Sequence, residues 1–371
     1  MRIGCPREIK NREYRVGLTP ESTKELVSHG HEVWIESGAG LGIGAGDDQY
    51  RACGARIVPD AATVFGECEM VVKVKEPQPD ELAMLRKGQI LYTYLHLAPD
   101  PEQTRGLINS GATAIAYETV TGPGRTLPLL KPMSQVAGRM SVHAGANALE
   151  KAHGGRGVLI GGVPGVLPAN VVVIGGGVVG FNAAQMSAGM GGRTTILDRN
   201  PEVLERVGTH FESRASTRFS NKANLEEAVS EADLVIGAVL IPGAAAPRLV
   251  TREMLKIMKP GAVLVDVAID QGGCFETSHP TTHDDPTFIV DGIVHYCVAN
   301  MPGAVSRTST YALNNVTLPH ALRIADLGWR AAMRSDPHLA QGLNVHAGKV
   351  TYPAVAKELG LDLLPLEEAL A

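Results

Sequence analysis

Short apolar runs alternate with longer amphipathic segments over the first 130 residues of the chain. The apolar runs predict strands at Arg2–Cys5, Glu32–Ile35, Arg56–Val58, Met70–Lys75, Ile90–Leu95 and Thr113–Tyr117. Helical patterns lie between several of these runs, and one has clear ends, with Thr19 and Pro20 at its start and Gly30 at its close. Strands that alternate with helices predict βαβ units and a parallel sheet.

A second region of the same kind follows residues 120–132, a stretch rich in proline and glycine without any period. A helical pattern over Met133–Ala152 leads into it. Its predicted strands are Val171–Ile174, Thr194–Leu197, Thr217–Phe219, Leu234–Ala238, Ala262–Val267 and Ile293–Cys297. Asn200 followed by Pro201 predicts the start of one helix in this region, and Asn224 is a further candidate cap.

The last 65 residues return to helical patterns, at Ser306–Arg334 and Tyr352–Leu359, and are too short for a third domain. We expect them to pack on the first region, since 371 residues exceed one ordinary core. The sequence therefore predicts two α/β domains, residues 1–132 with 305–371 and residues 133–304.

Composition excludes several classes of protein and partner. A net charge of -5 without any run of Lys or Arg argues against nucleic acid and against an anionic membrane surface. The cysteines are odd in number and dispersed, which is typical of free thiols in a reducing compartment; they are Cys5, Cys53, Cys68, Cys274 and Cys297. The uncharged stretch 157–192 is broken by prolines and glycines, so it predicts a buried strand, turn and helix rather than a membrane span. The N-terminus lacks the apolar stretch of a signal peptide, and we expect a cytoplasmic protein.

The sharpest motif is NVVVIGGGVVG, residues 170–180, where Gly175, Gly177 and Gly180 form G-x-G-x-x-G after an apolar strand and before a helix. The next predicted strand ends on Asp198, at the expected distance. The first glycine permits a tight turn, the second allows close approach of a pyrophosphate, and the third allows close packing of helix on strand. Asp198 is suited to the adenosine ribose and repels a 2′-phosphate, which favours NAD over NADP.

Two alternatives remain beside this interpretation. A tight turn that binds nothing has the same glycines, and Arg199 directly after Asp198 leaves NADP use open. A second glycine-rich stretch, SGAGLGIGAGDD at residues 37–48, also follows a strand. Asp47 and Asp48 stand where its helix would begin, and their carboxylates oppose a pyrophosphate, so we interpret this stretch as a structural loop.

In open α/β sheets, ligands bind beyond the carboxyl ends of the strands. In the second region those ends carry Ser220, Val239, Leu240, Asp270, Asn300 and Met301. Asp270 is followed by two glycines that allow a tight turn, and a turn or cap carboxylate is its alternative interpretation.

Two strands of the first region are predicted to end on groups that hold or move a proton. In VVKVKEP, alternation places Lys73 and Lys75 on one face, with Lys75 nearest the carboxyl end. In ILYTYLHLAPD, Tyr92, Tyr94 and His96 share a face, and His96 comes last. Taken singly, each group also fits a solvated or packing residue.

Arg12 and Arg15 follow the first strand of the same region. A guanidinium offers a planar fork for a carboxylate, an ammonium polarises a carbonyl, and an imidazole transfers protons near neutrality. Together these groups suit the oxidation of a small 2-amino or 2-hydroxy acid. A metal site at His279 and His283 is disfavoured, because the prolines around them prevent a helix that would align both rings.

Long stretches of the chain resemble the alanine dehydrogenase family, which includes the NAD-binding module of proton-pumping transhydrogenase. The stretches that carry the resemblance are IGCPREIKNREYRVGLTPESTKELVSHGH, VVKVKEPQ, YTYLHLA, LLKPMSQVAGRMS, GGGVVGFNAAQMSAGMGG, DVAIDQGGCFETSHPTTHDDP and VANMPGAVSRTST. The resemblance implies reversible NAD-dependent deamination of L-alanine to pyruvate and ammonia. It also implies two Rossmann-like doubly wound domains separated by a cleft and joined by long helices, in a homohexamer.

The resemblance also implies a role for individual residues. His96 and Asp270 would act as acid/base groups, and Lys75 would assist catalysis. Substrate binding would fall to Arg15, Lys75, Tyr94 and Asn300. NAD would be contacted by Ser134, Gly175, Gly177, Val178, Val179, Gly180, Asp198, Ser220, Val239, Leu240, Val267, Ala268, Ile269, Asp270, Val298, Ala299, Asn300 and Met301. Two alternatives stay open: a transhydrogenase NAD module, and a dehydrogenase for another small amino acid.

Overall fold

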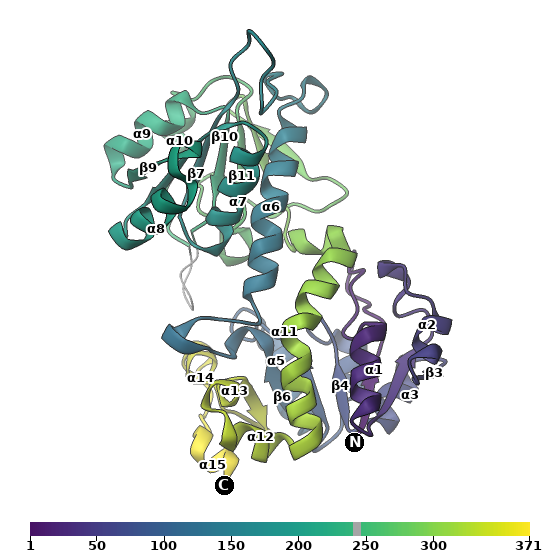
Figure 1. Ribbon diagram of the computed structural model, residues 1–371. Helices are drawn as coiled ribbons and strands as arrows, with labels where there is room; N and C mark the ends of the chain where they lie inside the picture. Colours follow the sequence, from purple (N-terminus) through teal and green to yellow (C-terminus); the bar gives the residue numbers. More distant parts are fainter. Residues whose placement is uncertain (240–245) are drawn as a thin grey trace. The chain divides into compact units, whose positions relative to one another are not determined.

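The structure is a computed structural model that describes residues 1–239 and 246–371 (Figure 1). The chain forms two compact units. Unit 1 comprises Met1–Met133 and Gly303–Ala371, and unit 2 comprises Ser134–Pro302. Among the described residues, no helix is both long enough and apolar enough to cross a membrane.

Unit 1 is built on a mixed sheet in the order β15-β14-β6-β5-β4-β1-β2-β3. Its strands are β1 Arg2–Cys5, β2 Glu32–Glu36, β3 Arg56–Val58, β4 Met70–Val72, β5 Ile90–Thr93, β6 Thr113–Ala116, β14 Leu343–His346 and β15 Lys349–Val350. The first six strands run parallel, and β14 and β15 add antiparallel pairs at one edge. The parallel part has the order 3-2-1-4-5-6 of a doubly wound fold, with its reversal between β1 and β4.

Helices cover the sheet of unit 1. They are α1 Pro20–Ser28, α2 Asp47–Ala52, α3 Ala61–Glu67, α4 Pro79–Met84, α5 Pro101–Ser110, α11 Ser306–Leu327, α12 Trp329–Ser335, α13 Pro337–Ala340, α14 Pro353–Leu359 and α15 Leu366–Leu370. As predicted, Thr19 caps α1 by accepting the Ser22 N–H, with Pro20 at the first helical position. As predicted, α2 begins at the paired carboxylates Asp47 and Asp48. The glycine-rich stretch before it forms a loop with one short 3₁₀ turn, Leu41–Ile43.

Unit 2 repeats the same topology in the order β12-β13-β11-β10-β7-β8-β9. Its strands are β7 Asn170–Ile174, β8 Arg193–Asp198, β9 Ala215–Phe219, β10 Leu234–Gly237, β11 Val263–Asp266, β12 Thr287–Val290 and β13 Ile293–Tyr296. All are parallel except β12, and the reversal falls between β7 and β10. Its helices are α6 Lys131–Ala148, which begins in unit 1, α7 Val178–Gly189, α8 Pro201–Phe211, α9 Lys222–Glu231 and α10 Arg252–Leu255. The predicted α/β class with two Rossmann-like doubly wound sheets is confirmed.

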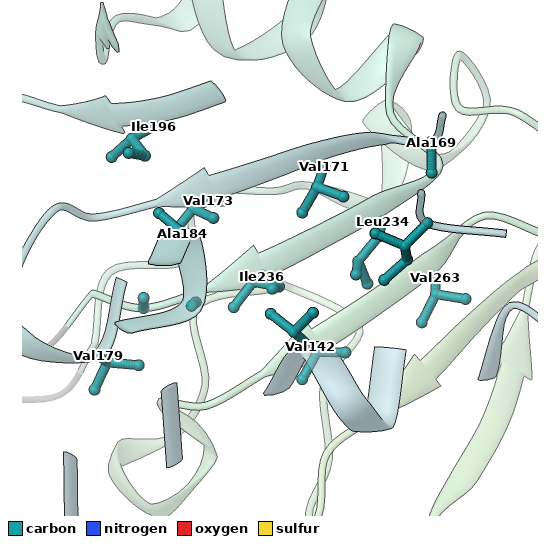
Figure 2. Close-up of a cluster of buried hydrophobic side chains, with 14 of the residues drawn as sticks. Val142, Ala169, Val171, Val173, Val179, Ala184, Ile196, Leu234, Ile236 and Val263 are labelled. Carbon is teal, nitrogen blue, oxygen red and sulfur yellow. The ribbon is translucent and has the colours of Figure 1, made fainter. Parts of the chain in front are cut away.

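The two faces of the unit 2 sheet carry separate cores, because neighbouring residues on a strand point to opposite faces. On one face, Val171 and Val173 pack with residues of α6, α7 and α8. Figure 2 shows this cluster, with Val142 from α6 and Val179 from α7 among its side chains. On the other face, Val172 and its neighbours pack with residues of α9 and α10. A sheet buried on both faces explains the continuous apolar run before the glycine motif.

Two predicted strands of unit 1 end earlier than their sequence pattern indicated. β4 ends at Val72, so the expected placement of Lys73 and Lys75 on one strand face is wrong. A carboxylate oxygen of Glu8 accepts the Val74 N–H at 2.6 Å, where a strand would continue its ladder. β5 ends at Thr93, and His96 has a φ of +51°, so strict alternation does not reach that ring.

Several other expectations need correction. The helix expected at Ser306–Arg334 is two helices, since Gly328 adopts a φ of +76° between them. The C-terminal part also contains β14 and β15, which the helical patterns did not indicate, and β12 was likewise missed. The cap of α9 is Asn221 rather than Asn224, and its side chain accepts the Asn224 N–H at 2.8 Å. The helix expected at Met133–Ala152 ends at Ala148.

Candidate functional site

The glycine motif of unit 2 forms a tight turn between β7 and α7. Gly175 has a φ of +102°, and a Cβ on Gly180 would lie 1.7 Å from the Gly175 carbonyl oxygen. Gly177 is the exposed N-cap of α7, its cap has no side-chain hydrogen bond, and a Cβ there would meet nothing within 4 Å. The 12-residue helix α7 therefore starts at a glycine with free space around it, and Val178 and Val179 lie in the first turn of the helix. The N–H groups of that turn have no partner within the helix.

The carboxylate of Asp198 lies beside this turn at the end of β8. One of its oxygens accepts the Gly176 N–H at 2.7 Å, and the other accepts the Asn200 N–H at 2.8 Å. The Ser220 N–H binds the Asp198 carbonyl oxygen at 2.9 Å, so the ends of β8 and β9 are tied together. The structure thus brings Gly175, Asp198 and Ser220 to one edge of the unit 2 sheet.

The switch point of unit 2 lies between the ends of β7 and β10. A Cβ on Gly175 would lie 2.7 Å from the Ala238 carbonyl oxygen and 3.2 Å from the Val239 side chain. The turn after β7 therefore touches the segment after β10, where a doubly wound sheet places its ligand. Leu240, which was expected to contact NAD, lies outside the described residues.

The segment Val267–Asp270 is held by a carboxylate that no sequence motif indicated. Asp266 is buried at the end of β11 and accepts the N–H groups of Ala268 at 3.1 Å and Cys274 at 2.9 Å, and the Ser278 hydroxyl at 2.6 Å. Burial raises the pKa of Asp266, against the opposing effect of these hydrogen bonds. Asp270 itself is exposed on a 3₁₀ turn, Ile269–Gln271, which Gly272 closes with a φ of +89°.

The remaining residues expected to contact NAD occupy two further places in unit 2. Ser134 is half-buried on α6, and the segment Val298–Met301 follows β13. The Ala299 N–H binds the Thr281 carbonyl oxygen at 3.2 Å, and Asn300 has a φ of +57°. A left-handed residue other than glycine is uncommon and often marks a functional segment.

In unit 1, the expected substrate residues follow three neighbouring parallel strands. Arg15 comes after β1, Lys75 after β4, and Tyr94 and His96 after β5. Because β1, β4 and β5 are adjacent and parallel, their carboxyl ends lie at the same edge, and the reversal of strand order falls between β1 and β4.

Arg15 forms a buried ion pair with Glu13, a residue that no sequence motif singled out. Its Nε donates to Glu13 Oε1 at 2.6 Å and its Nη2 donates to Oε2 at 2.5 Å. Burial opposes the guanidinium charge, but the hydrogen bonds and the charge of Glu13 hold the pKa of Arg15 above its ordinary value. Nη1 lies 3.1 Å from the Met133 sulfur, so the plane of the guanidinium is fixed.

The two lysines after β4 have different surroundings. Lys73 is fully buried, and its Nζ lies 3.1 Å from Glu8 Oε2 and 2.7 Å from Glu81 Oε1. Lys75 is half-buried, and Glu8 Oε1 accepts its backbone N–H at 3.4 Å. Lys73 therefore forms a buried ionic triad with Glu8 and Glu81. Glu8 also binds Lys75, through the backbone N–H of that residue.

His96 lies against Tyr94 and beside Glu118. The rings of Tyr94 and His96 are nearly parallel, at 7° with centroids 5.8 Å apart. The Tyr94 hydroxyl donates to the Leu129 carbonyl oxygen at 2.7 Å, and burial raises the pKa of Tyr94. Glu118, which the sequence motifs also did not indicate, accepts the His96 backbone N–H at 2.7 Å. A cation, a phenol and a partly exposed imidazole thus share one edge of unit 1.

The histidines of the SHPTTHDDP stretch have structural roles in unit 2. The ring of His279 stacks on Phe288 with centroids 3.7 Å apart, and His283 lies 3.4 Å from the Asn300 carbonyl oxygen. Over the described ranges, no three His, Cys, Asp or Glu side chains group closely enough to hold a metal ion.

Comparisons with known proteins identify the family of the chain. Residues 4–137 match the family model "Alanine dehydrogenase/PNT, N-terminal domain", and residues 141–353 match "Alanine dehydrogenase/PNT, C-terminal domain". The alanine dehydrogenase of Halomonas elongata is 60% identical over 362 residues, which cover 98% of each chain. That of Mycolicibacterium smegmatis is 56% identical over 371 residues, which cover 100% of both.

Solved structures give the same result. An L-alanine dehydrogenase matches with a TM-score of 0.94 and 54% identity, over 97% of this chain and 99% of that one. A transhydrogenase from Sinorhizobium meliloti matches with a TM-score of 0.81 and 26% identity, over 95% of this chain and 100% of that one.

Proposed function

Because this chain belongs to the alanine dehydrogenase/PNT family, we propose that it catalyses the reversible, NAD-dependent oxidative deamination of L-alanine to pyruvate and ammonia. The observation that carries this proposal is the identity of 60% to an alanine dehydrogenase over 98% of each chain. The transhydrogenase alternative is supported less, since that structure is 26% identical. Unit 1 serves as the substrate domain and unit 2 as the NAD-binding domain.

The residues of unit 2 fit NAD. The open glycine at the start of α7 and the uncapped first turn suit a pyrophosphate, and the Asp198 carboxylate suits the adenosine ribose. Ser134, Ser220, Val239, Leu240 and the segments Val267–Asp270 and Val298–Met301 complete the proposed contacts. When bound, NAD accepts the hydride that leaves the substrate carbon.

Substrate binding is proposed for the cationic edge of unit 1. Arg15 holds the alanine carboxylate through its guanidinium fork, whose plane Glu13 fixes. Lys75 neutralises the carboxylate and polarises the oxygen of pyruvate in the reverse direction. Tyr94 of this edge and Asn300 of unit 2 are further proposed contacts of the substrate. These groups orient Cα for hydride loss, which leaves an iminium held by its carboxylate.

The proton transfers are assigned to His96 and Asp270. Water adds to the iminium carbon, and one of these two groups removes a proton from the water. The product is a carbinolamine. The nitrogen then takes up a proton and leaves as ammonia, while one of the two acid/base groups removes the hydroxyl proton and the carbonyl of pyruvate forms. An imidazole side chain can both accept and donate a proton in general acid–base catalysis. The exposed carboxylate of Asp270 serves as the second group.

Replacement of Gly180 by alanine is expected to weaken NADH binding about 10- to 100-fold, or by about 1.4–2.8 kcal/mol, because the turn proposed to hold the pyrophosphate must change its shape. The new methyl group would lie 1.7 Å from the Gly175 carbonyl oxygen, so the turn must move. Gly189→Ala, in the same helix, is the matched control, because a Cβ there meets nothing within 4 Å. Fluorescence titration with NADH measures both variants, and equal affinities would contradict the proposed role of the turn.

An NAD-reduction assay across amino acids tests the proposed activity. We expect L-alanine to give the highest kcat/KM and pyruvate with ammonia to oxidise NADH in the reverse direction. Preference for glycine or lysine over alanine would refute the substrate assignment.

From the family resemblance we also propose a cytoplasmic homohexamer. Light scattering that gives a mass other than that of six chains would contradict this assembly.

A further inference from the structure

His96 has an unusual backbone for the residue proposed to transfer protons. Its φ of +51° lies in the left-handed region, although it carries a β-carbon. It follows β5 by three residues, and its side chain is 46% exposed. Nothing about a histidine requires this conformation, so neighbouring groups must hold it.

The Glu118 carboxylate provides that hold. Its two oxygens accept the Leu95 N–H at 3.3 and 3.2 Å, and Oε1 accepts the His96 N–H at 2.7 Å. Two consecutive N–H groups that converge on one anion are typical of a backbone nest. The Glu118 side chain is only 12% exposed, so water competes little for these bonds.

Glu118 is itself well anchored. It belongs to a 3₁₀ turn, Tyr117–Thr119, directly after β6, which pairs in parallel with β5. The Tyr117 hydroxyl donates to the Lys73 carbonyl oxygen at 2.9 Å, and the Thr119 hydroxyl accepts from Asn344 at 2.7 Å. A buried turn therefore presents the carboxylate to the segment that carries His96.

We propose that Glu118 is a positioning residue, which holds the His96 imidazole in place for proton transfer by binding the backbone N–H groups of Leu95 and His96. The inference rests on the proposed function of His96. The hydrogen bonds of the carboxylate go to the backbone, because His96 Nδ1 lies 3.9 Å from Glu118 Oε1, which is too far for a hydrogen bond and within reach of an ion pair only when the ring is protonated. The parallel ring of Tyr94 supports the imidazole from one face.

The same device recurs after β4. Glu8 accepts the N–H groups of Val74 at 2.6 Å and Lys75 at 3.4 Å. In both cases an acidic residue follows one strand of the sheet, and its carboxylate accepts two consecutive N–H groups that follow a different strand. The second N–H group of each pair belongs to a proposed site residue, Lys75 or His96. This supports a positioning role over a general capping role.

The test compares Glu118→Ala and Glu118→Gln in the full-length protein, each with and without His96→Ala. Glu118→Ala is expected to lower kcat for alanine oxidation about 100-fold with little change in KM, because displacement of a catalytic group by about 1 Å has that effect. Glu118→Gln is expected to retain most of the activity, because its amide oxygen still accepts both N–H groups. In the His96→Ala background, Glu118→Ala is expected to change kcat by less than about twofold, since the two residues act as a unit.

Asp60→Ala is the control for loss of a carboxylate that binds backbone, because Asp60 accepts the Thr63 N–H at 2.8 Å at the start of α3. We expect its kcat to equal that of the wild type. An equal fall in kcat for Glu118→Ala with and without His96 would overturn the inference and leave Glu118 a structural residue.

A crystal structure of Glu118→Ala provides a readout that does not depend on activity. The φ of residue 96 is expected to leave the left-handed region. A φ that stays between about +20° and +160° would overturn the inference. Absence of alanine-dependent NADH formation by the wild type would refute the proposed function instead, and the crystal structure would then decide the role of Glu118.

Discussion

Replacement of Lys75 by alanine is expected to lower kcat for alanine oxidation about 1000-fold, since loss of one group that stabilises developing charge has an effect of this size. Two hydrogen bonds of the Lys75 backbone do not involve its side chain. Its N–H binds Glu8 at 3.4 Å, and its carbonyl oxygen accepts the Thr93 hydroxyl at 2.9 Å. Alanine keeps both bonds, so NADH affinity and the unfolding midpoint are expected to stay unchanged.

Lys10→Ala is the matched control for Lys75→Ala. Lys10 is an ammonium in the same region and pairs with Glu76, the residue next to Lys75. Its removal deletes a cation without touching the proposed substrate contacts, so kcat is expected to stay close to that of the wild type. Steady-state kinetics with alanine and titration with NADH measure both variants. Retained turnover in Lys75→Ala would remove Lys75 from the mechanism.

The glycine motif of unit 2 and the acidic residue after it were predictable because their signals are local. Gly175, Gly177 and Gly180 lie within six residues, and each spacing follows from one strand, one turn and one helix. Asp198 could be found because the next parallel strand ends one βαβ unit later. These features need only neighbouring residues and a regular fold, so the structure places all of them at one edge.

The difference between Lys73 and Lys75 could not be predicted, because it depends on distant residues. Alternation treats both lysines alike, whereas Glu8, which is 65 residues from Lys73 in sequence, accepts a hydrogen bond from the side chain of Lys73 but from the backbone N–H of Lys75. The edge strands β14 and β15 were missed for a similar reason. β14 spans four residues and pairs with β6, more than 200 residues earlier, and the two-residue β15 pairs in turn with β14.

Three of the carboxylates that bind backbone N–H groups were not indicated by any sequence motif. Glu8, Glu118 and Asp266 each lie at or shortly after the carboxyl end of a strand. An acidic residue in that position, within a doubly wound fold, is a signal that could have been used, because the N–H groups of neighbouring strand ends converge there. What remains hidden in the sequence is which segment each carboxylate binds.

Replacement of Lys73 by methionine is expected to destabilise unit 1 by about 3–5 kcal/mol, the usual effect of removing one partner from a buried ion pair. Lys73 is 0% exposed, and the side chains of Glu8 and Glu81 are each 1% exposed. Without the ammonium, two buried carboxylates lose their common counter-charge. Tryptophan fluorescence during denaturant unfolding measures the effect in this unit, since both tryptophans, Trp34 and Trp329, belong to it.

The pH dependence follows from the pKa shifts of the triad. Burial opposes the charge of Lys73, but Glu8 and Glu81 raise its pKa above the ordinary 10.5. Its contribution to stability is therefore fully present below pH 10.5 and is lost as the pH rises through the raised value. Burial raises the pKa of Glu8, so a protonated Glu8 favours the folded state at low pH. Lys73→Met is accordingly expected to regain stability relative to the wild type as the pH is lowered, because Glu8 then takes up a proton.

Arg51→Met is the control for loss of a cation in the same unit. Arg51 pairs with Asp48 at 2.6 Å on the surface, where the two side chains are 55% and 96% exposed. Solvent screens such a pair, so the unfolding midpoint is expected to stay almost unchanged. An equal midpoint for Lys73→Met and the wild type at pH 8 would show that the triad does not stabilise unit 1. A loss of stability that stays constant down to pH 5 would instead show that Glu8 does not take up a proton when its counter-charge is removed.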